Sequence, residues 1–476
     1  MHSHTIKRRT DFLMIGAILL LLVIHPALQK SSASSPISQI QAVVWSPVAL
    51  GPFVAFATAQ PEPANTPLTR VAQRLSRRLK QRNMPSLPLV TLVAALEEQR
   101  ALLHKRTTVS LSLPDSEDVK AWEANLQRYP QWIQAMITPT DAHFLLSPAA
   151  IARTLNTEDI PGIIRPVNVS LQTLITDKKD VLRAGTDGVA HTGITFDVPK
   201  AVTAIYDALL RDTGELMIPL REENGTIENT SGIDLGALTL LGTGTSDFAG
   251  SPTGRIRNIR KALNEHVNNV LVAPGETFSF NDTLGGPVTM SNGWYESKVI
   301  FEGVNLRMAP GGGICQASTT VFRAMLNTGL QEVERANHSL YVSYYEKGGV
   351  GIDATVYPGQ QDLTFVNDTG NYLLLQAYEK GTEATVNIYG TPDGRSVTMH
   401  GPYFSSSDLS DFPEETRQPR SNEIAWIQQR TFANSKTEER VIFSRYLTGL
   451  PKLLAAKYNA LHASAVGSGS TLISER

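Results

Sequence analysis

Three consecutive glycines, Gly311 to Gly313, precede Cys315, which is the only cysteine in the sequence. A run of glycines adopts backbone angles that other residues avoid, so it favours a tight turn over a helix or a strand. The residues that follow, from Gln316 to Leu326, place apolar side chains at helical spacing. The sequence therefore predicts a turn followed by a helix, with Cys315 in the first turn of that helix.

The first turn of a helix is a favourable position for a thiolate. Its N–H groups lack intrahelical acceptors, and the helix dipole stabilises negative charge there. We expect the glycines to let a substrate chain approach closely, and their amides to receive a developing oxyanion. The alternative interpretation is that Cys315 is a small buried apolar residue behind a tight turn.

Cysteine catalysis of acyl transfer also needs a base that maintains the thiolate and a third group that orients the base. His338, which precedes a predicted strand at 340–345, is the candidate base. Asp353, at the start of the next predicted strand, is the candidate for the second imidazole nitrogen. The alternatives are a lone buried histidine and a strand-capping aspartate. The candidate substrate contacts are Gly311, Gly312, Gly313, Gln316 and Ser339.

The N-terminus predicts export from the cytoplasm. Lys7, Arg8 and Arg9 precede a mostly apolar run from Phe12 to Leu28, the pattern of a secretory signal or of a short membrane anchor. Residues 57–59 have the small-residue spacing of a signal-peptide cleavage site. Of the two interpretations, a cleaved signal and a retained membrane anchor, we favour the anchor. The protein is then extracytoplasmic, either anchored in the cytoplasmic membrane or secreted to the cell wall. A lone cysteine in that compartment is open to oxidation, which favours a functional role.

Composition and periodicity divide the chain into four parts. We predict a signal or anchor with a proline-rich linker at 1–67, a small α+β domain at 68–225, a main domain at 235–402, and a partly disordered C-terminal extension at 403–476. Within the first domain, residues 116–128 read as a helix. The predicted fold class of the main domain is α+β, with a mixed or antiparallel sheet packed against helices.

Charge and residue spacing exclude several classes of function. The chain of 476 residues carries 43 basic and 45 acidic residues, so its net charge does not favour a nucleic-acid partner. The single cysteine and the ten histidines show no spacing typical of a metal site, and no dinucleotide or phosphate-loop motif follows a strand. We therefore expect no metal and no cofactor.

Four motif segments occur in an order that resembles the VanW-like family. They are Pro274 to Asn281, Gly311 to Gln316 followed by Ser318 to Thr320, His338-Ser339, and Asp353 to Val356. The α+β pattern of 68–225 resembles the peptidoglycan-binding domain that often precedes VanW-like domains in bacterial surface proteins.

The resemblance implies an exported cell-envelope protein that acts on peptidoglycan stem peptides as a cysteine-dependent L,D-transpeptidase, with Cys315 as its nucleophile. Its partners would be those stem peptides and, through the N-terminal segment, the cytoplasmic membrane. The alternative is a non-catalytic peptidoglycan-binding accessory protein that is linked to the glycopeptide response.

Overall fold

The computed structural model describes residues 66–113, 116–301, 303, 305–447, 449–451 and 453–468. The predicted anchor from Phe12 to Leu28 lies outside these residues. Within them, no helix has the length and apolar character needed to cross a membrane. The chain forms two compact units: the first ends at Ile164 and resumes over Ile194–Arg221, whereas the second consists of Arg165–Gly193 and the residues from Glu222 onward.

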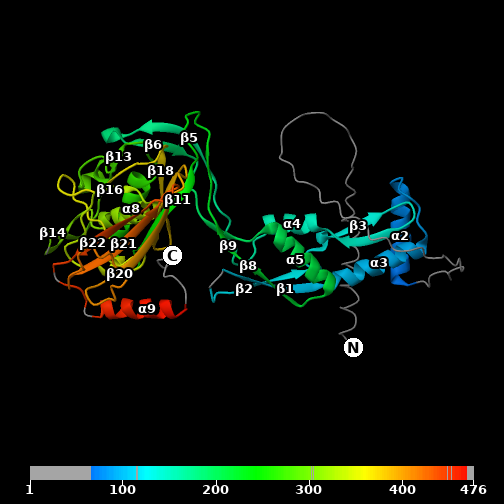
Figure 1. Ribbon diagram of the computed structural model, residues 1–476. Coiled ribbons are helices and arrows are strands. Elements are labelled where there is room, and N and C mark those ends of the chain that lie inside the picture. Colours follow the sequence, from blue (N-terminus) through cyan, green and yellow to red (C-terminus); the bar gives the residue numbers. More distant parts are fainter. Residues whose placement is uncertain are drawn as a thin grey trace. The chain divides into compact units, whose positions relative to one another are not determined.

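The first unit combines helices with short sheets (Figure 1). Its main elements are α2 (Pro67–Gln81), α3 (Leu89–Leu103), β1 (Arg106–Ser112), β2 (Lys120–Asn125), β3 (Ile133–Ile137), β4 (Ala142–Leu146), α4 (Pro148–Thr157), α5 (Val198–Arg211) and β8 (Glu215–Pro219). One sheet has the order β2-β1-β8, and β3 pairs with β4. Ser147 and Asp197 cap α4 and α5 through their side chains, as their sequence patterns predict.

The helix predicted at 116–128 is wrong, because this segment contains strand β2. Trp122 and Ala124 are buried while Ala121 and Glu123 are exposed, which is the two-residue alternation of a strand. β2 pairs antiparallel with β1, and Trp122 lies opposite Val109. Burial of the aromatic side chain in this core outweighs the helix propensity of the neighbouring residues.

The second unit is built on a seven-stranded sheet of order β10-β5-β6-β12-β18-β19-β11. These strands are β5 (Val169–Thr176), β6 (Leu182–Thr186), β10 (Ile227–Asn229), β11 (Thr239–Asp247), β12 (Val270–Val272), β18 (Leu373–Lys380) and β19 (Glu383–Gly390). The β10–β5 pair is parallel and the other neighbouring pairs are antiparallel. The predicted α+β fold class with a mixed sheet is confirmed.

Three smaller sheets and several helices complete this unit. The sheets are β13 (Thr277–Ser279) with β17 (Thr364–Val366) and β16 (Gln331–Glu334), β14 (Glu296–Phe301) with β15 (Asn305–Pro310), and β20 (Ser396–Tyr403) with β21 (Glu423–Thr431) and β22 (Thr437–Arg445). The helices are α6 (Thr253–Lys261), which continues as a π-helix at Ala262–Val267, then α7 (Phe280–Thr283), α8 (Ile314–Thr328) and α9 (Leu454–Ser468).

The compact units differ from the predicted domains in two places. Residues 165–193, assigned by sequence to the first domain, supply β5 and β6 to the sheet of the second unit, where Leu171 packs in the same core as Leu374. Residues after 403, assigned to a partly disordered extension, supply β21 and β22, and Ile424 and Trp426 join the main core of that unit. Periodicity identifies a strand, but it does not show which core the strand joins.

α8 packs on one face of the large sheet, against β11 and β19. Along β18, Leu373, Leu375 and Ala377 belong to the core that contains the α8 residue Val321, while Leu374 belongs to the core on the opposite face. Because of this alternation, one face of β18 contributes to the core in which the cysteine helix packs.

Two glycines of β11 let α8 approach the strand closely. A Cβ atom on Gly244 would lie 2.2 Å from the carbonyl oxygen of Thr320, and one on Gly242 would lie 2.3 Å from the hydroxyl oxygen of Thr328. Any larger side chain at these positions would push the helix away from the sheet. The N-terminus of α8, with Cys315, is therefore held at a fixed depth in the fold.

A buried arginine of α8 ties the helix to the segments around it. The Arg323 guanidinium donates hydrogen bonds to backbone carbonyls only. The acceptors are the oxygens of Thr245, Tyr345, Lys347, Gly349 and Ile352, at 2.6 to 3.0 Å. Four of these carbonyls lie between residues 345 and 352. This segment has no helix or strand after Tyr345, so the bonds from Arg323 tie it to α8.

We expect Arg323→Met to lower the free energy of unfolding by about 3–5 kcal/mol, because it leaves these buried carbonyls without donors. Denaturant titration followed by tryptophan fluorescence measures the effect. Arg257→Met is the matched control, because Arg257 is exposed and its loss should cost less than about 1 kcal/mol. Equal effects of the two substitutions would contradict this role of Arg323.

Candidate active site

Cys315 occupies the first turn of α8, as predicted. The helix begins at Ile314, and Gly313 is its N-cap residue with a φ of 115°. The Cys315 side chain is partly exposed, whereas the next residues of the helix are buried. The sulfur lies 3.6 Å from both the Thr355 hydroxyl oxygen and the Val356 carbonyl oxygen.

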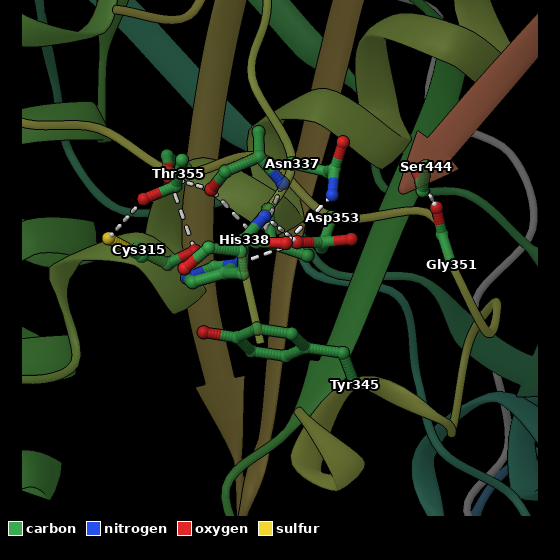
Figure 2. Close-up of polar contacts among 12 residues, drawn as sticks. Cys315, Asn337, His338, Tyr345, Gly351, Asp353, Thr355 and Ser444 are labelled. Atoms are coloured by element: carbon green, nitrogen blue, oxygen red, sulfur yellow. Dashed lines mark hydrogen bonds and ion pairs between the residues drawn. The ribbon is translucent and has the colours of Figure 1, made fainter. Parts of the chain in front are cut away.

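His338 lies between Cys315 and Asp353 (Figure 2). Its Nδ1 is 2.5 Å from Asp353 Oδ2, and its backbone N–H donates to the same oxygen at 2.8 Å. The imidazole of His338 also acts on Cys315, because it lowers the pKa of the thiol. Because Nδ1 is engaged by Asp353, Nε2 is the nitrogen available to the thiol. The structure thus brings all three predicted catalytic side chains together in one relay.

The backbone that carries His338 and Asp353 differs from the prediction. Residues 340–345 contain a 3₁₀ turn at Ser343–Tyr345 instead of a strand, and 353–357 contains isolated bridges at Thr355 and Tyr357 instead of a strand. Asp353 is buried, and its carboxylate contacts the imidazole and the N–H of His338, the Tyr446 hydroxyl and the Arg335 guanidinium. These contacts hold both segments in place, as strand pairing would in a sheet.

The three glycines pack against the protein interior. A Cβ atom on Gly312 would lie 2.6 Å from the Lys298 carbonyl oxygen, and one on Gly311 would lie 2.4 Å from a methyl of Val288. Gly311 N–H donates to the Tyr295 carbonyl at 3.1 Å, so it is not free for an oxyanion. Tight packing is therefore one physical reason for glycine at 311 and 312, and their contact with a substrate stays a prediction.

The other two predicted substrate contacts have structural partners. The Gln316 side chain is 0% exposed and donates to the Ser246 hydroxyl at 3.2 Å, which places it in the core. Ser339 donates to the carbonyl of Gly303. Both side chains thus donate within the fold, and substrate binding by Gln316 and Ser339 stays a prediction.

Comparison with known proteins places these residues in a family. Residues 254–389 match the family described as "VanW like protein", and this range contains all four motif segments. Residues 254–389 are a VanW-like domain. The match begins after the first unit, so the peptidoglycan-binding domain at 68–225 stays a prediction.

Two curated relatives resemble the region of the VanW-like domain. The chain is 36% identical over 154 residues to "Uncharacterized protein YoaR" of Bacillus subtilis (strain 168), covering 32% of this chain and 48% of the relative. It is 33% identical over 127 residues to "Vancomycin B-type resistance protein VanW" of Enterococcus faecalis (strain ATCC 700802 / V583), covering 24% of this chain and 42% of the relative. The chain thus spans less than half of each relative's length. No solved structure matches the chain.

The electrostatics of the site favour a negative charge on the Cys315 sulfur and a positive charge on the His338 imidazole. Burial alone would raise the pKa of the Cys315 thiol, but the hydrogen bond and positive charge of His338, with smaller effects of Val356 and Thr355, lower the pKa below its ordinary value. Burial alone would lower the pKa of His338, but its bonds to Asp353 and Cys315 raise it to about 10. Both shifts act in the same direction: they favour transfer of the proton from the Cys315 sulfur to the His338 imidazole.

Several residues of the site were missed by sequence reasoning. Tyr446 donates to Asp353 Oδ1 at 2.8 Å, Arg335 Nη2 lies 3.9 Å from the same oxygen, and the Tyr345 ring lies 5.3 Å from the His338 ring. Thr355 belongs to a recognised motif segment, which was the available signal for it. Tyr446 lies outside the family match, and no local pattern marks it. Across the described residues there is no group of His, Cys, Asp and Glu that would hold a metal ion.

We expect alkylation of Cys315 by iodoacetamide to follow a titration with a midpoint below 9.0, the ordinary value for a thiol. His338→Ala removes the hydrogen bond and the charge but leaves the burial, so the midpoint should rise above that value. The rate at pH 7 should then fall at least about tenfold, because the rate follows the thiolate fraction. His191→Ala is the control, because it also removes a partly buried imidazole, but one whose ring packs on Tyr378. An unchanged midpoint in His338→Ala would show that the imidazole does not activate the thiol.

Proposed function

We propose that this protein is an exported cell-envelope enzyme in which Cys315 carries out acyl transfer on peptidoglycan stem peptides. The observation that carries the proposal is the arrangement of Cys315, His338 and Asp353, in which a partly exposed thiol lies next to a buried, carboxylate-bound imidazole. A merely structural cysteine does not need such a partner. The relative named as a vancomycin resistance protein supports the cell wall as the place of action.

The chemistry follows from the relay. The Cys315 thiolate attacks the carbonyl carbon of the L-to-D peptide bond in a stem tetrapeptide, forming a C–S bond. The oxyanion is received by the Cys315 N–H in the first turn of α8, because the N–H groups of Gly311, Ile314 and Gln316 already donate to backbone carbonyls. The His338 imidazolium gives its Nε2 proton to the leaving amine, and the terminal D-amino acid departs as the C–N bond breaks.

The second half of the reaction regenerates the enzyme. An amine of a neighbouring stem attacks the thioester, neutral His338 takes its proton, and the C–S bond breaks to release the new amide and the thiolate. Asp353 holds the imidazole in the tautomer that this cycle needs: burial alone would raise the pKa of Asp353, but the bonds and charge of His338 lower it to about 2, so the carboxylate stays ionised throughout.

Intact-mass spectrometry of the full-length protein, incubated with a purified disaccharide tetrapeptide, tests the proposal. We expect an adduct on Cys315 with the mass of the muropeptide after loss of the terminal D-alanine, together with free D-alanine in solution. Reversible binding of the intact muropeptide, with no adduct and no D-alanine, would replace the enzyme with a peptidoglycan-binding accessory protein.

A further inference from the structure

The carboxylate of Asp353 is held from both of its oxygens. Oδ2 receives the imidazole and the backbone N–H of His338. Oδ1 receives the Tyr446 hydroxyl at 2.8 Å and faces Arg335 Nη2 at 3.9 Å. Because each oxygen has its own partners, the carboxylate has a single orientation in which Oδ2 points at the imidazole.

The partners of Oδ1 depend on strand β22. Arg335 donates to the Phe443 carbonyl at 3.0 Å and to the Ser444 hydroxyl at 2.7 Å. Ser444 in turn donates to the Gly351 carbonyl at 2.5 Å, as Figure 2 shows. Tyr446 follows the end of β22 directly.

The segment that carries His338 is bound to the same strand. Asn337 Nδ2 donates to the Arg445 carbonyl at 2.7 Å, and Leu447 N–H donates to the Ser339 carbonyl at 2.7 Å. Residues 335–339 and 351–353 have no strand of their own apart from the bridge at Ala336. The end of β22 is therefore a common support for the histidine and for the aspartate.

We propose that the end of β22, acting through Tyr446 and Arg335, is a positioning element of the catalytic relay, so that the active site of the VanW-like domain is completed by residues beyond its family match. This inference rests on the proposed function. The family match ends at residue 389, whereas Tyr446, which contacts Asp353, and Phe443 and Ser444, which hold Arg335, lie beyond it. The Tyr446 hydroxyl remains a donor at every physiological pH, because burial and then the charge of Asp353 raise its pKa.

Tyr446→Phe in the full-length protein tests the inference, since it removes one hydroxyl and keeps the ring. We expect kcat for D-alanine release to fall about ten- to hundredfold with KM unchanged, because the imidazole is misplaced while the substrate surface is intact. In protein labelled with ¹⁵N-histidine, the His338 Nδ1–H signal should broaden or exchange faster with water. Arg335→Lys, which keeps the charge but loses the planar fork, should have the same two effects.

Tyr389→Phe is the matched control. The Tyr389 hydroxyl is also buried in the second unit, where it accepts a hydrogen bond from Asn387 at 3.2 Å, so its loss has a similar structural cost without touching Asp353. If Tyr446→Phe and Tyr389→Phe change kcat and the His338 signal alike, β22 is only structural and the inference is overturned. The histidine signal decides this even if the unmodified protein releases no D-alanine, a result that would overturn the proposed function alone.

Discussion

Replacing Cys315 by alanine is expected to lower the rate of D-alanine release from a stem tetrapeptide by more than about 10³-fold. The substitution removes the nucleophile, so no thioester can form, and only the binding and oxyanion contributions remain. Alanine fits the space of the cysteine and is a good helix residue, so the free energy of unfolding should change by about 1 kcal/mol or less. Release is measured by coupled detection of free D-alanine, and folding by thermal denaturation.

Binding must be measured on the same variant, because a binding protein and an enzyme differ at this point. Isothermal titration with the muropeptide should give a similar Kd for Cys315→Ala and for the unmodified protein. If the alanine variant releases D-alanine at the full rate, Cys315 is a structural residue of α8 and the acyl-transfer proposal fails.

Asp353→Asn is expected to lower the same rate by about 10³- to 10⁴-fold. The asparagine amide would donate to His338 Nδ1, which holds the imidazole as the neutral Nε2–H tautomer, so the ring can no longer take the thiol proton and form an imidazolium. The positive charge on the imidazole would also lose its nearest carboxylate. Steady-state kinetics with the stem tetrapeptide should show the loss in kcat, with a smaller change in KM.

Asp362→Asn provides the comparison for Asp353→Asn. Asp362 is a half-buried carboxylate of the same unit, and it accepts hydrogen bonds from Ser279 and from the N–H of Asn281 instead of from His338. Its substitution should lower stability but leave kcat within about twofold while the protein is folded. A similar loss of kcat in both variants would mean that Asp353 acts through folding alone.

The sequence allowed the turn, the helix and the relay to be predicted because their signals are local or are carried by motifs. The three glycines before Cys315 indicated a turn and a helix start, and the structure has both. His338 and Asp353 were chosen for their chemistry, and the structure brings them together. Their backbone was predicted as strands, since short apolar runs do not distinguish a strand from a loop that buried hydrogen bonds hold in place.

What could not be predicted depends on contacts between distant parts of the chain. Tyr446 lies 93 residues from Asp353 in sequence, yet its hydroxyl contacts the carboxylate. Trp426 donates to the Val350 carbonyl at 2.7 Å, so the segment read as an extension supports the loop before Asp353. Sequence also does not reveal what a missing side chain makes room for: at Gly312 it is β14, because a Cβ atom there would lie 2.6 Å from the Lys298 carbonyl oxygen.

The seven-stranded sheet has a consequence for cutting the chain. Strand β12 pairs with β6 on one side, with Val270 opposite Arg183 and Leu271 opposite Leu182. A fragment that began at the family match, residue 254, would lose β6, β5, β10 and β11, leaving N–H and C=O groups of β12 and of β19 unpaired. Such open edges recruit strands from other molecules, so the domain defined by sequence similarity is an aggregation-prone fragment, whereas the folding unit that contains it extends back to residue 165.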